Sequence, residues 1–200
     1  MTDQVSPDRP LPMVKSQPVY VPLSADSSAR RHVLVAESLG LEAIFRVIDA
    51  IRDNGVSVEV YWLGSVPDRL ASHPDVYSFD SIALLSDALV ERLAQAEMGL
   101  RLYMAGHEAF LWQINQVCSE MGLRDDEIQR EACGSLARRV FCVHCRNLLE
   151  DVTTNPVPCP RCHVLLEVRD HFSRALAAYI GVVVNAEDPN DRPEPQEQFA

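Results

Sequence analysis

Four cysteines, arranged as two Cys-x-x-Cys pairs, are the residues of this chain whose type and spacing best suit chemistry. The first pair is Cys142 and Cys145, and the second, Cys159 and Cys162, follows after thirteen residues. Two such pairs supply four thiolates to one tetrahedral metal ion. The alternative is two disulfides in a secreted domain, but residues 1–24 lack the apolar core of a signal peptide, and reduced thiols favour a metal. We therefore predict one ion bound by these four cysteines.

The identity of the ion is narrowed by the residues that follow the pairs. Zinc and rubredoxin-type iron both use two Cys-x-x-Cys pairs, so spacing alone does not separate them. Rubredoxins usually place glycine after each pair, because amides must approach the sulfurs closely, whereas here Arg146 and His163 follow. This difference favours structural zinc, with iron as the alternative. His144 and His163 adjoin the pairs, but four cysteines already complete a ligand set, so we interpret both as bystanders or as donors to the ligands.

The charge of the chain restricts its partners. The 200 residues carry a net charge of −11, and 47% of them are hydrophobic. An acidic chain is not expected to be a general binder of nucleic acid or anionic membranes, and no apolar run approaches the length of a membrane span. Residues 133–174 are the exception, with six arginines against four acids. This weakly basic segment is the one feature that supports an alternative function, a zinc-ribbon regulatory or nucleic-acid-binding protein.

Composition divides the chain into four parts. Residues 1–30 contain five prolines and are expected to form an extended arm. Residues 31–132 alternate between strand and helix patterns, and residues 133–184 form the four-cysteine ribbon with a following helix. Residues 185–200 are acidic and rich in proline, so we expect a flexible tail.

The second part predicts a parallel sheet. His32–Ala36 and Val56–Trp62 are patterned as strands, and an amphipathic helix begins between them at Leu41. A strand, a helix and a strand within about thirty residues form a βαβ unit, whose two strands are parallel. Leu100–Ala105 continues this pattern, and residues 126–131 are predicted as a final edge strand. The fold class is therefore α/β.

Residues 170–182, after the last predicted ribbon strand, contain apolar residues at helical spacing. The set expected on one face is Phe172, Leu176, Tyr179 and Ile180. We predict a helix that caps the ribbon or that presents Phe172 and Arg174 to another subunit, since aromatic rings and arginines anchor interfaces. In the second case residues 139–182 form the docking surface.

Residues 32–131 resemble the nicotinamide-binding half of ferredoxin-reductase-type flavoenzymes. The glycine-rich loop of that family, Ala-Gly-Gly-x-Gly-x-Thr-Pro, aligns with Ala36-Glu37-Ser38-Leu39-Gly40-Leu41-Glu42-Ala43, and its Tyr-x-Cys-Gly-Pro turn aligns with Tyr103-Met104-Ala105-Gly106-His107. The resemblance implies a flavodoxin-like or Rossmann-like sheet. Glu37 and Glu42 place negative charge where a pyrophosphate would lie, and Ser38 adds a side chain there. We therefore predict that this domain has lost its nucleotide and has no catalytic or cofactor-binding residues.

The sheet, the ribbon and the run from Asp170-His171-Phe172-Ser173-Arg174 to Gly181-Val182 together resemble the DmmA-type subunits of bacterial dimethylamine monooxygenase. The resemblance implies a cytoplasmic complex with a haem-bearing oxygenase subunit and a reductase subunit carrying FMN and a 2Fe-2S cluster. Such a complex uses NADPH and O2 to convert dimethylamine to methylamine and formaldehyde. For this chain the resemblance implies a noncatalytic or electron-relay subunit of a hetero-oligomer, with neither nucleic acid nor membrane as a partner.

Overall fold

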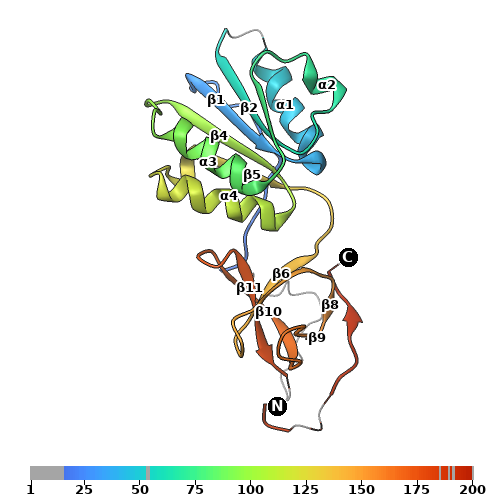
Figure 1. Cartoon of the computed structure of the whole chain (residues 1–200). Helices are drawn as coiled ribbons and strands as arrows, with labels where there is room; N and C mark the ends of the chain where they lie inside the picture. The colour runs from blue at the N-terminus through green and yellow to red at the C-terminus, as the bar shows by residue number, and fades with distance from the viewer. Residues whose placement is uncertain (1–15, 53–54, 185, 189, 191, 200) are drawn as a thin grey trace, which may run out of the picture.

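The computed structural model describes residues 16–52, 55–184, 186–188, 190 and 192–199. Two units follow one another along the long axis of the molecule, an α/β domain and a smaller all-β ribbon (Figure 1). Within the described residues, no helix has both the length and the apolar character that crossing a membrane requires.

The α/β domain is built on a five-stranded parallel sheet in the order β3-β2-β1-β4-β5, which confirms the predicted fold class. Its strands are β1 Arg31–Ala36, β2 Ser57–Leu63, β3 Val76–Phe79, β4 Leu100–Gly106 and β5 Ile128–Ala132. Its helices are η1 Ser38–Gly40, α1 Leu41–Ile51, α2 Asp68–Ala71, α3 Ile82–Leu93, α4 Glu108–Glu120 and η2 Asp125–Glu127. This strand order is that of nucleotide-binding sheets, in which β1 and β4 are central neighbours.

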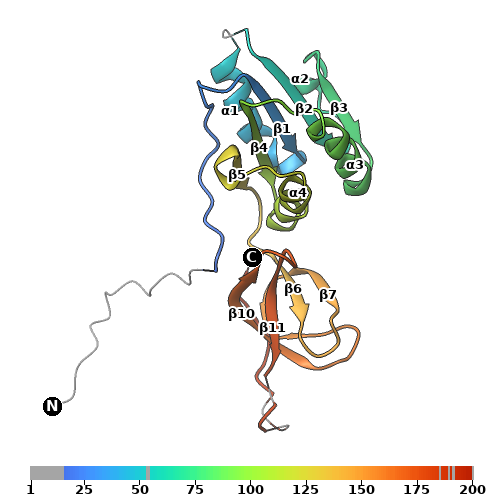
Figure 2. The ribbon, with the colours of Figure 1, turned by 90° about the vertical axis from the view of Figure 1, so that its left-hand side faces the viewer.

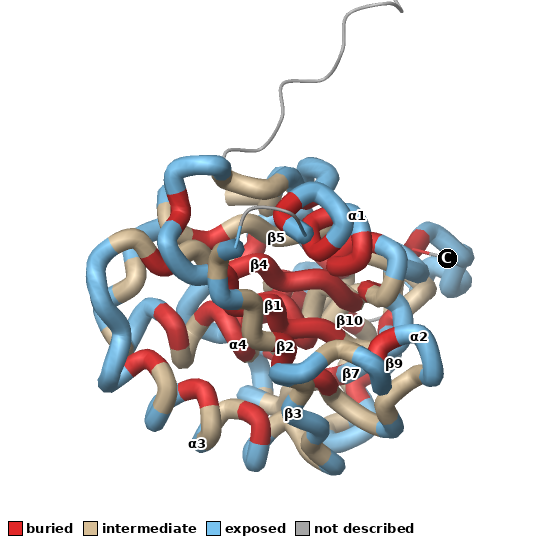
Figure 3. Tube along the Cα trace, turned by 90° about the horizontal axis from the view of Figure 1, so that it is seen from above, coloured by how far each residue is buried: buried red, intermediate tan, exposed pale blue. Residues whose placement is uncertain are grey.

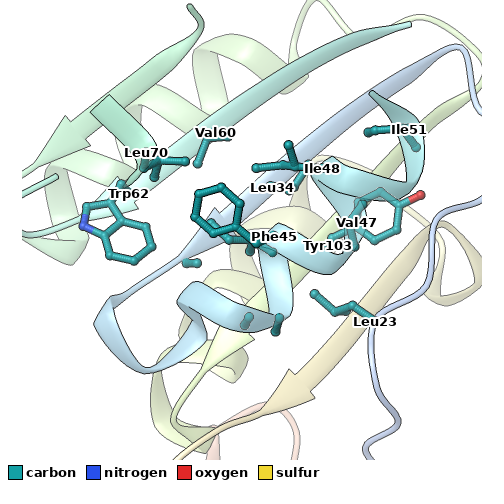
Figure 4. Close-up of a cluster of buried hydrophobic side chains, with 14 residues drawn as sticks. Leu23, Leu34, Phe45, Val47, Ile48, Ile51, Val60, Trp62, Leu70 and Tyr103 are labelled. Atoms are coloured by element: carbon teal, nitrogen blue, oxygen red, sulfur yellow. The ribbon is translucent and has the colours of Figure 1, made fainter. Parts of the chain in front are cut away.

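Helices cover both faces of this sheet, as the chirality of βαβ crossovers requires. Leu34 of β1 packs with Phe45 and Ile48 of α1 and with Trp62 of β2 on one face (Figure 4). Val33 packs on the other face with residues of α3 and α4. Because β1 is buried on both sides, its sequence is a continuous apolar run rather than an alternating one. Figure 3 shows the buried segments concentrated on β1 and β4.

The ribbon is a five-stranded mixed sheet in the order β7-β6-β11-β10-β9, with a separate pair formed by β8 and β12. Its strands are β6 Arg138–Cys142, β7 Leu148–Val152, β8 Thr154–Asn155, β9 Val157–Pro158, β10 Leu165–Ser173, β11 Ala178–Val183 and β12 Gln196–Glu197. Strands β6 and β11 run parallel, and β10 and β11 form an antiparallel hairpin.

The predicted helix over residues 170–182 is wrong, because this segment is the end of β10, a turn and β11. Phe172 and Tyr179 are direct cross-strand partners in the hairpin. A spacing of seven residues places two side chains on one face of a helix, but it also brings them opposite each other when a short turn lies between them. Ala177 completes that turn with a left-handed φ of 49°.

The expectation of a flexible tail is also corrected for its last described residues. Gln196 and Glu197 pair with Asn155 and Thr154, which orders this part of the chain against the ribbon. Phe199 is 4% exposed and belongs to the hydrophobic core of the ribbon. The burial of one aromatic side chain therefore overrides the polar composition around it.

The described part of the arm, from Ser16, lies along β5 and continues toward the junction with the ribbon (Figure 2). Its backbone amide at Leu23 donates to Glu131 Oε2 at 2.6 Å, and the amide at Ser24 donates to Gln129 Oε1 at 3.0 Å. Side chains of the edge strand thus bind the arm, and Leu23 is buried against the core. Residues 1–15 lie outside the described residues.

Candidate metal centre

The four cysteines predicted from the sequence come together in the ribbon, with their sulfurs all within 4.8 Å of one another. The Sγ atoms of Cys142 and Cys162 are 3.8 Å apart, and those of Cys145 and Cys159 are 3.6 Å apart. A tetrahedral ion with metal–sulfur bonds of about 2.3 Å requires sulfur separations of about 3.8 Å. Disulfide sulfurs would be about 2.05 Å apart, so these thiols are unpaired. The geometry fits one four-coordinate ion.

The two cysteine pairs occupy matching turns. In the first, the Arg146 amide donates to the Cys142 carbonyl at 2.8 Å, and in the second, the His163 amide donates to the Cys159 carbonyl at 2.9 Å. Arg146 and His163 have left-handed φ values of 63° and 60°. These are the positions at which rubredoxins place glycine, so this chain forms the same turn with larger residues, at a cost of about 1 kcal/mol or more each.

Strands β6 and β11 hold the first cysteine turn in place. Cys142 ends β6, and the Val143 amide donates to the Gly181 carbonyl of β11 at 3.1 Å. A Cβ atom at Gly181 would lie 2.8 Å from Val140 Cγ1, closer than side-chain packing allows. Glycine at this position therefore lets the two strands approach closely beneath the metal centre.

The thiols of the cluster differ in acidity. Burial raises the pKa of Cys159, but hydrogen bonds from the Cys162 and Arg161 amides outweigh it and lower this pKa to about 7. An amide hydrogen bond from Val164 lowers the pKa of Cys162, but desolvation and the three neighbouring sulfurs outweigh it and raise this pKa to about 12. Cys159 and Cys162 therefore do not ionise together by themselves, whereas a divalent cation would stabilise adjacent thiolates.

The outer side of the cluster is basic. Exposed residues on the two turns, which we call the knuckle face, are Val143, His144, Arg146, Pro160, Arg161 and His163. His144 and His163 are exposed and lie outside the four-cysteine cluster. Arg161 Nη1 donates to the Cys145 carbonyl at 3.4 Å. Four thiolates with one divalent ion carry a formal charge of −2. The arginines of this face place positive charge beside that negative charge.

The crevice that would hold a nucleotide lies between β1 and β4, where the connections leave in opposite directions. Glu37 fills it. Its Oε1 atom accepts a hydrogen bond from the His107 amide at 2.6 Å, at the start of α4, and also contacts Nδ1 of the same histidine. The contact between the imidazole Nδ1 and this carboxylate stabilises the protonated ring and raises the pKa of His107 above its usual value. A carboxylate of the chain itself thus occupies the anion site of the α4 N-terminus.

The other residues of the former loop do not face a ligand. A Cβ atom at Gly40 would lie 2.3 Å from the Ala105 carbonyl oxygen, so this glycine serves the close packing of η1 on β4. Glu42 was expected to oppose a phosphate, but its side chain is 80% exposed and pairs with Arg69 at 2.9 Å. Of the two glutamates that were predicted to repel a pyrophosphate, only Glu37 is therefore still expected to do so.

We expect no measurable binding of NADH or NADPH by the purified chain, because the Glu37 carboxylate blocks and repels the pyrophosphate. Isothermal titration with either nucleotide at millimolar concentration is expected to give only heats of dilution. The matched variant Glu37→Gln keeps the shape of the side chain and removes its charge, and it separates steric from electrostatic exclusion. Micromolar affinity in the unaltered chain would contradict this prediction.

Sequence reasoning missed a half-buried carboxylate at the domain junction. Glu108, the first residue of α4, accepts hydrogen bonds on Oε1 from the hydroxyls of Tyr20 at 2.7 Å and Tyr179 at 3.2 Å. Trp112 Nε1 donates to the Tyr20 hydroxyl at 2.8 Å. These residues come from the arm, α4 and β11, so no local sequence pattern could have linked them. Burial raises the pKa of Glu108 above its usual value.

The predicted docking residues belong to the same junction. Phe172 is 4% exposed and packs against Trp112, with ring centroids 5.1 Å apart. Arg174 is 63% exposed, but it lies over the Trp112 ring and 3.9 Å from Asp125. Phe172 is therefore not available to a partner, and the β10–β11 hairpin joins the ribbon to α4 of its own chain. The part of the docking prediction that names Phe172 is wrong, whereas Arg174 is exposed and its role in docking stays a prediction.

The fold and the site define a class of protein, a parallel-sheet α/β domain joined to a four-cysteine ribbon. The family model described as "Dimethylamine monooxygenase subunit DmmA-like, N-terminal domain" matches residues 12–128, and the corresponding C-terminal domain model matches residues 139–182. The chain belongs to the DmmA-like family, as the sequence resemblance predicted.

A curated relative agrees with this assignment. The chain is 35% identical over 174 residues to the heme-dependent oxidative N-demethylase delta subunit of Ectopseudomonas mendocina (strain ymp), covering 87% of this chain and 91% of the relative.

Solved structures show only distant similarity. Phthalate dioxygenase reductase is 16% identical with a TM-score of 0.46, covering 64% of this chain and 46% of that one. An intact type IV self-sufficient cytochrome P450 monooxygenase is 17% identical with a TM-score of 0.46, covering 80% of this chain and 27% of that one. The chain spans less than half the length of either protein.

Proposed function

We propose that this chain is a noncatalytic subunit of a cytoplasmic, multicomponent, haem-dependent dimethylamine monooxygenase, and that Cys142, Cys145, Cys159 and Cys162 bind one zinc ion. The observation that carries the proposal is the four-sulfur cluster in a chain of this family whose nucleotide crevice is filled. The name of the relative, a delta subunit of an N-demethylase, supports membership in a larger assembly. The chemistry is then expected on other subunits, one bearing haem and one bearing FMN and a 2Fe-2S cluster.

Zinc is the ion that the turns favour. The residues after each cysteine pair are Arg146 and His163, where rubredoxin-type iron sites usually have glycine. A zinc ion would cross-link β6 to the turn after β9 and would not change oxidation state, so its contribution is shape. With iron, the same cluster would instead serve as an electron relay between the reductase subunit and the haem, and this is the second candidate function.

The knuckle face is the part of the ribbon that we propose for docking on the haem-bearing subunit. Arg146 and Arg161 are exposed there, Val143 is 44% exposed, and the face contains no acidic residue. The rest of the chain is strongly acidic, so an acidic partner surface would be attracted to this face and repelled elsewhere. The face carries no Phe, Tyr or Trp, the larger aromatic rings on which bases stack, which disfavours a nucleic-acid function.

Leaving this chain out of a mixture with the partner subunits tests the proposed function. The partner subunits are expected to demethylate dimethylamine with NADPH at full rate only when the metal-loaded chain is present, and the chain is expected to copurify with them. Metal analysis and the visible spectrum of the isolated chain distinguish the two candidates, since zinc is colourless and four-sulfur iron absorbs. Full turnover without the chain, or salt-sensitive binding to nucleic acid in place of assembly, would reject the proposal.

A further inference from the structure

A cavity of about 570 Å³ lies where α4 and β5 of the α/β domain face the turn of the β10–β11 hairpin. Gln116 Nε2 of α4 donates to the Ala175 carbonyl of this turn at 2.6 Å, which fixes the two sides of the cavity to each other (Figure 1). The volume lies within the range of small-molecule sites, which often occur at domain junctions. The four cysteines of the metal cluster do not line this cavity. The lining residues used below are Asn115, Glu120, Asp125, Ile128, Arg130, Arg174 and Ala175.

The guanidinium of Arg130 is a fixed donor with one accessible nitrogen. Its Nε atom donates to Asn115 Oδ1 at 2.9 Å, its Nη2 atom donates to Asp125 Oδ1 at 2.7 Å, and its side chain is only 13% exposed. Its Nη1 atom has no hydrogen-bond partner within the described residues and is not among the buried unpaired atoms, so it keeps accessible surface. Because Nη1 and Nη2 form one edge of the planar group, a carboxylate that faces this edge can accept from both.

Arg174 brings a second guanidinium to the cavity from the ribbon. Its side chain is 63% exposed, and its Nη1 atom lies 3.9 Å from Asp125 Oδ2. The guanidiniums of Arg130 and Arg174 lie 5.4 and 5.5 Å from the centroid of the same ring, that of Trp112. One carboxylate of the chain, that of Asp125, therefore already reaches both arginines, so the spacing between the two guanidiniums suits a carboxylate group.

Asp125 holds this position only weakly. Its side chain is 68% exposed, and ion pairs between exposed groups contribute little to stability, so its carboxylate can turn out into solvent at small cost. It also accepts from Nη2 of Arg130 and leaves Nη1 without an acceptor. Glu120, the other acid of the lining, forms no ion pair within the described residues, and its charge disfavours a ligand with a second negative group.

We propose that this cavity binds a small monocarboxylate, which takes the place of Asp125 on Arg130 and Arg174. The ligand carboxylate accepts from Nη1 and Nη2 of Arg130, and Arg174 contacts it from the ribbon. The alkyl part of the ligand lies against Ile128 and Ala175, the apolar residues of the lining. The site is separate from the metal centre and does not depend on the proposed function. A bound ligand would join the α/β domain to the ribbon.

Three probes test the proposal on the full-length, metal-loaded chain at constant ionic strength: propionate is a monocarboxylate, propionamide is its neutral analogue, and inorganic phosphate is an anion of higher charge. In NMR titrations, propionate is expected to shift the side-chain signals of Arg130 and Arg174 and to bind at least about tenfold more tightly than propionamide. Phosphate is expected to bind more weakly than propionate because of Glu120. Tighter binding of phosphate or propionamide, or no shift of these signals with propionate, would overturn the proposal.

Two variants, each with a matched control, locate the site. Asp125→Asn removes the competing carboxylate and is expected to raise the affinity for propionate at least about threefold, whereas Arg174→Gln is expected to lower it by a similar factor. The controls Asp126→Asn and Arg124→Gln make the same charge changes at exposed neighbours that pair with each other outside the cavity, and they are expected to leave the affinity unchanged. Equal effects of a variant and its control would show a general charge effect and overturn the site. Unchanged affinity in Arg174→Gln would place the ligand elsewhere.

Discussion

Replacing Cys145 by serine is expected to release the metal ion and to unfold the ribbon while the α/β domain stays folded. The ribbon has a small core, and structural zinc contributes about 10–16 kcal/mol of apparent binding free energy, which becomes folding free energy. A serine hydroxyl does not replace a thiolate ligand near neutral pH. The measurements are metal content per chain, expected to fall from one to near zero, and the dispersion of amide signals from residues 139–170.

The survival of the α/β domain follows from its packing. The two core clusters of that domain contain residues of the sheet, its helices and the arm, whereas the ribbon core is a separate cluster that includes Trp112 of α4. Cys133→Ala provides a matched control, because this half-buried thiol lies outside the metal cluster and its loss should leave the metal content unchanged. Stoichiometric metal with four-sulfur coordination in Cys145→Ser would show that the ligands are wrongly assigned.

Reversing the charge of Arg146 and Arg161 together to glutamate is expected to weaken assembly with the haem-bearing subunit by at least about tenfold at physiological salt. The knuckle face would change from basic to acidic and would match the charge of the rest of the chain. Analytical ultracentrifugation or copurification measures assembly, and the difference should narrow as salt is raised, because exposed charges are screened.

The controls separate docking from net charge and from damage to the metal site. Arg52 and Arg169 are exposed arginines away from the knuckle face, with 68% and 57% of their side chains accessible. Changing both to glutamate alters the net charge of the chain by the same amount as changing Arg146 and Arg161. Arg161 also donates to the Cys145 carbonyl, so metal content must be measured in every variant. Equal weakening by the control pair, or intact assembly of the Arg146 and Arg161 variant, would contradict the proposed docking face.

These two experiments address different parts of one argument. The cysteine variant tests whether the ion is required for the ribbon to fold. The charge reversal tests whether the knuckle face is an interface. If the charge reversal leaves assembly intact but abolishes turnover, the electron-relay function gains support. If the metal is lost and assembly persists, the α/β domain carries the interface instead.

The sequence alone determined the features that depend on local chemistry and periodicity. The spacing of Cys142, Cys145, Cys159 and Cys162 predicted one cluster, because soft ligands in two short turns converge only in a few ways. The apolar run His32–Ala36 and the helix after it predicted a parallel sheet, because strand and helix periods differ. The motif departure at Glu37 drew attention to a carboxylate that accepts a hydrogen bond from the His107 amide, and its effect on nucleotide binding stays a prediction.

The tertiary structure decided what depends on distant parts of the chain. Phe172 and Tyr179 fitted a helix by spacing, but pairing across a hairpin buries both against Trp112, and a helix would leave the hydrogen-bonding edge of β6 without β11. Phe199 is ordered because the ribbon offers an apolar site that its own sequence neighbours do not reveal. The groups at the junction, Arg138 and Glu108, lie thirty positions apart and become neighbours only because the β10–β11 hairpin packs on α4.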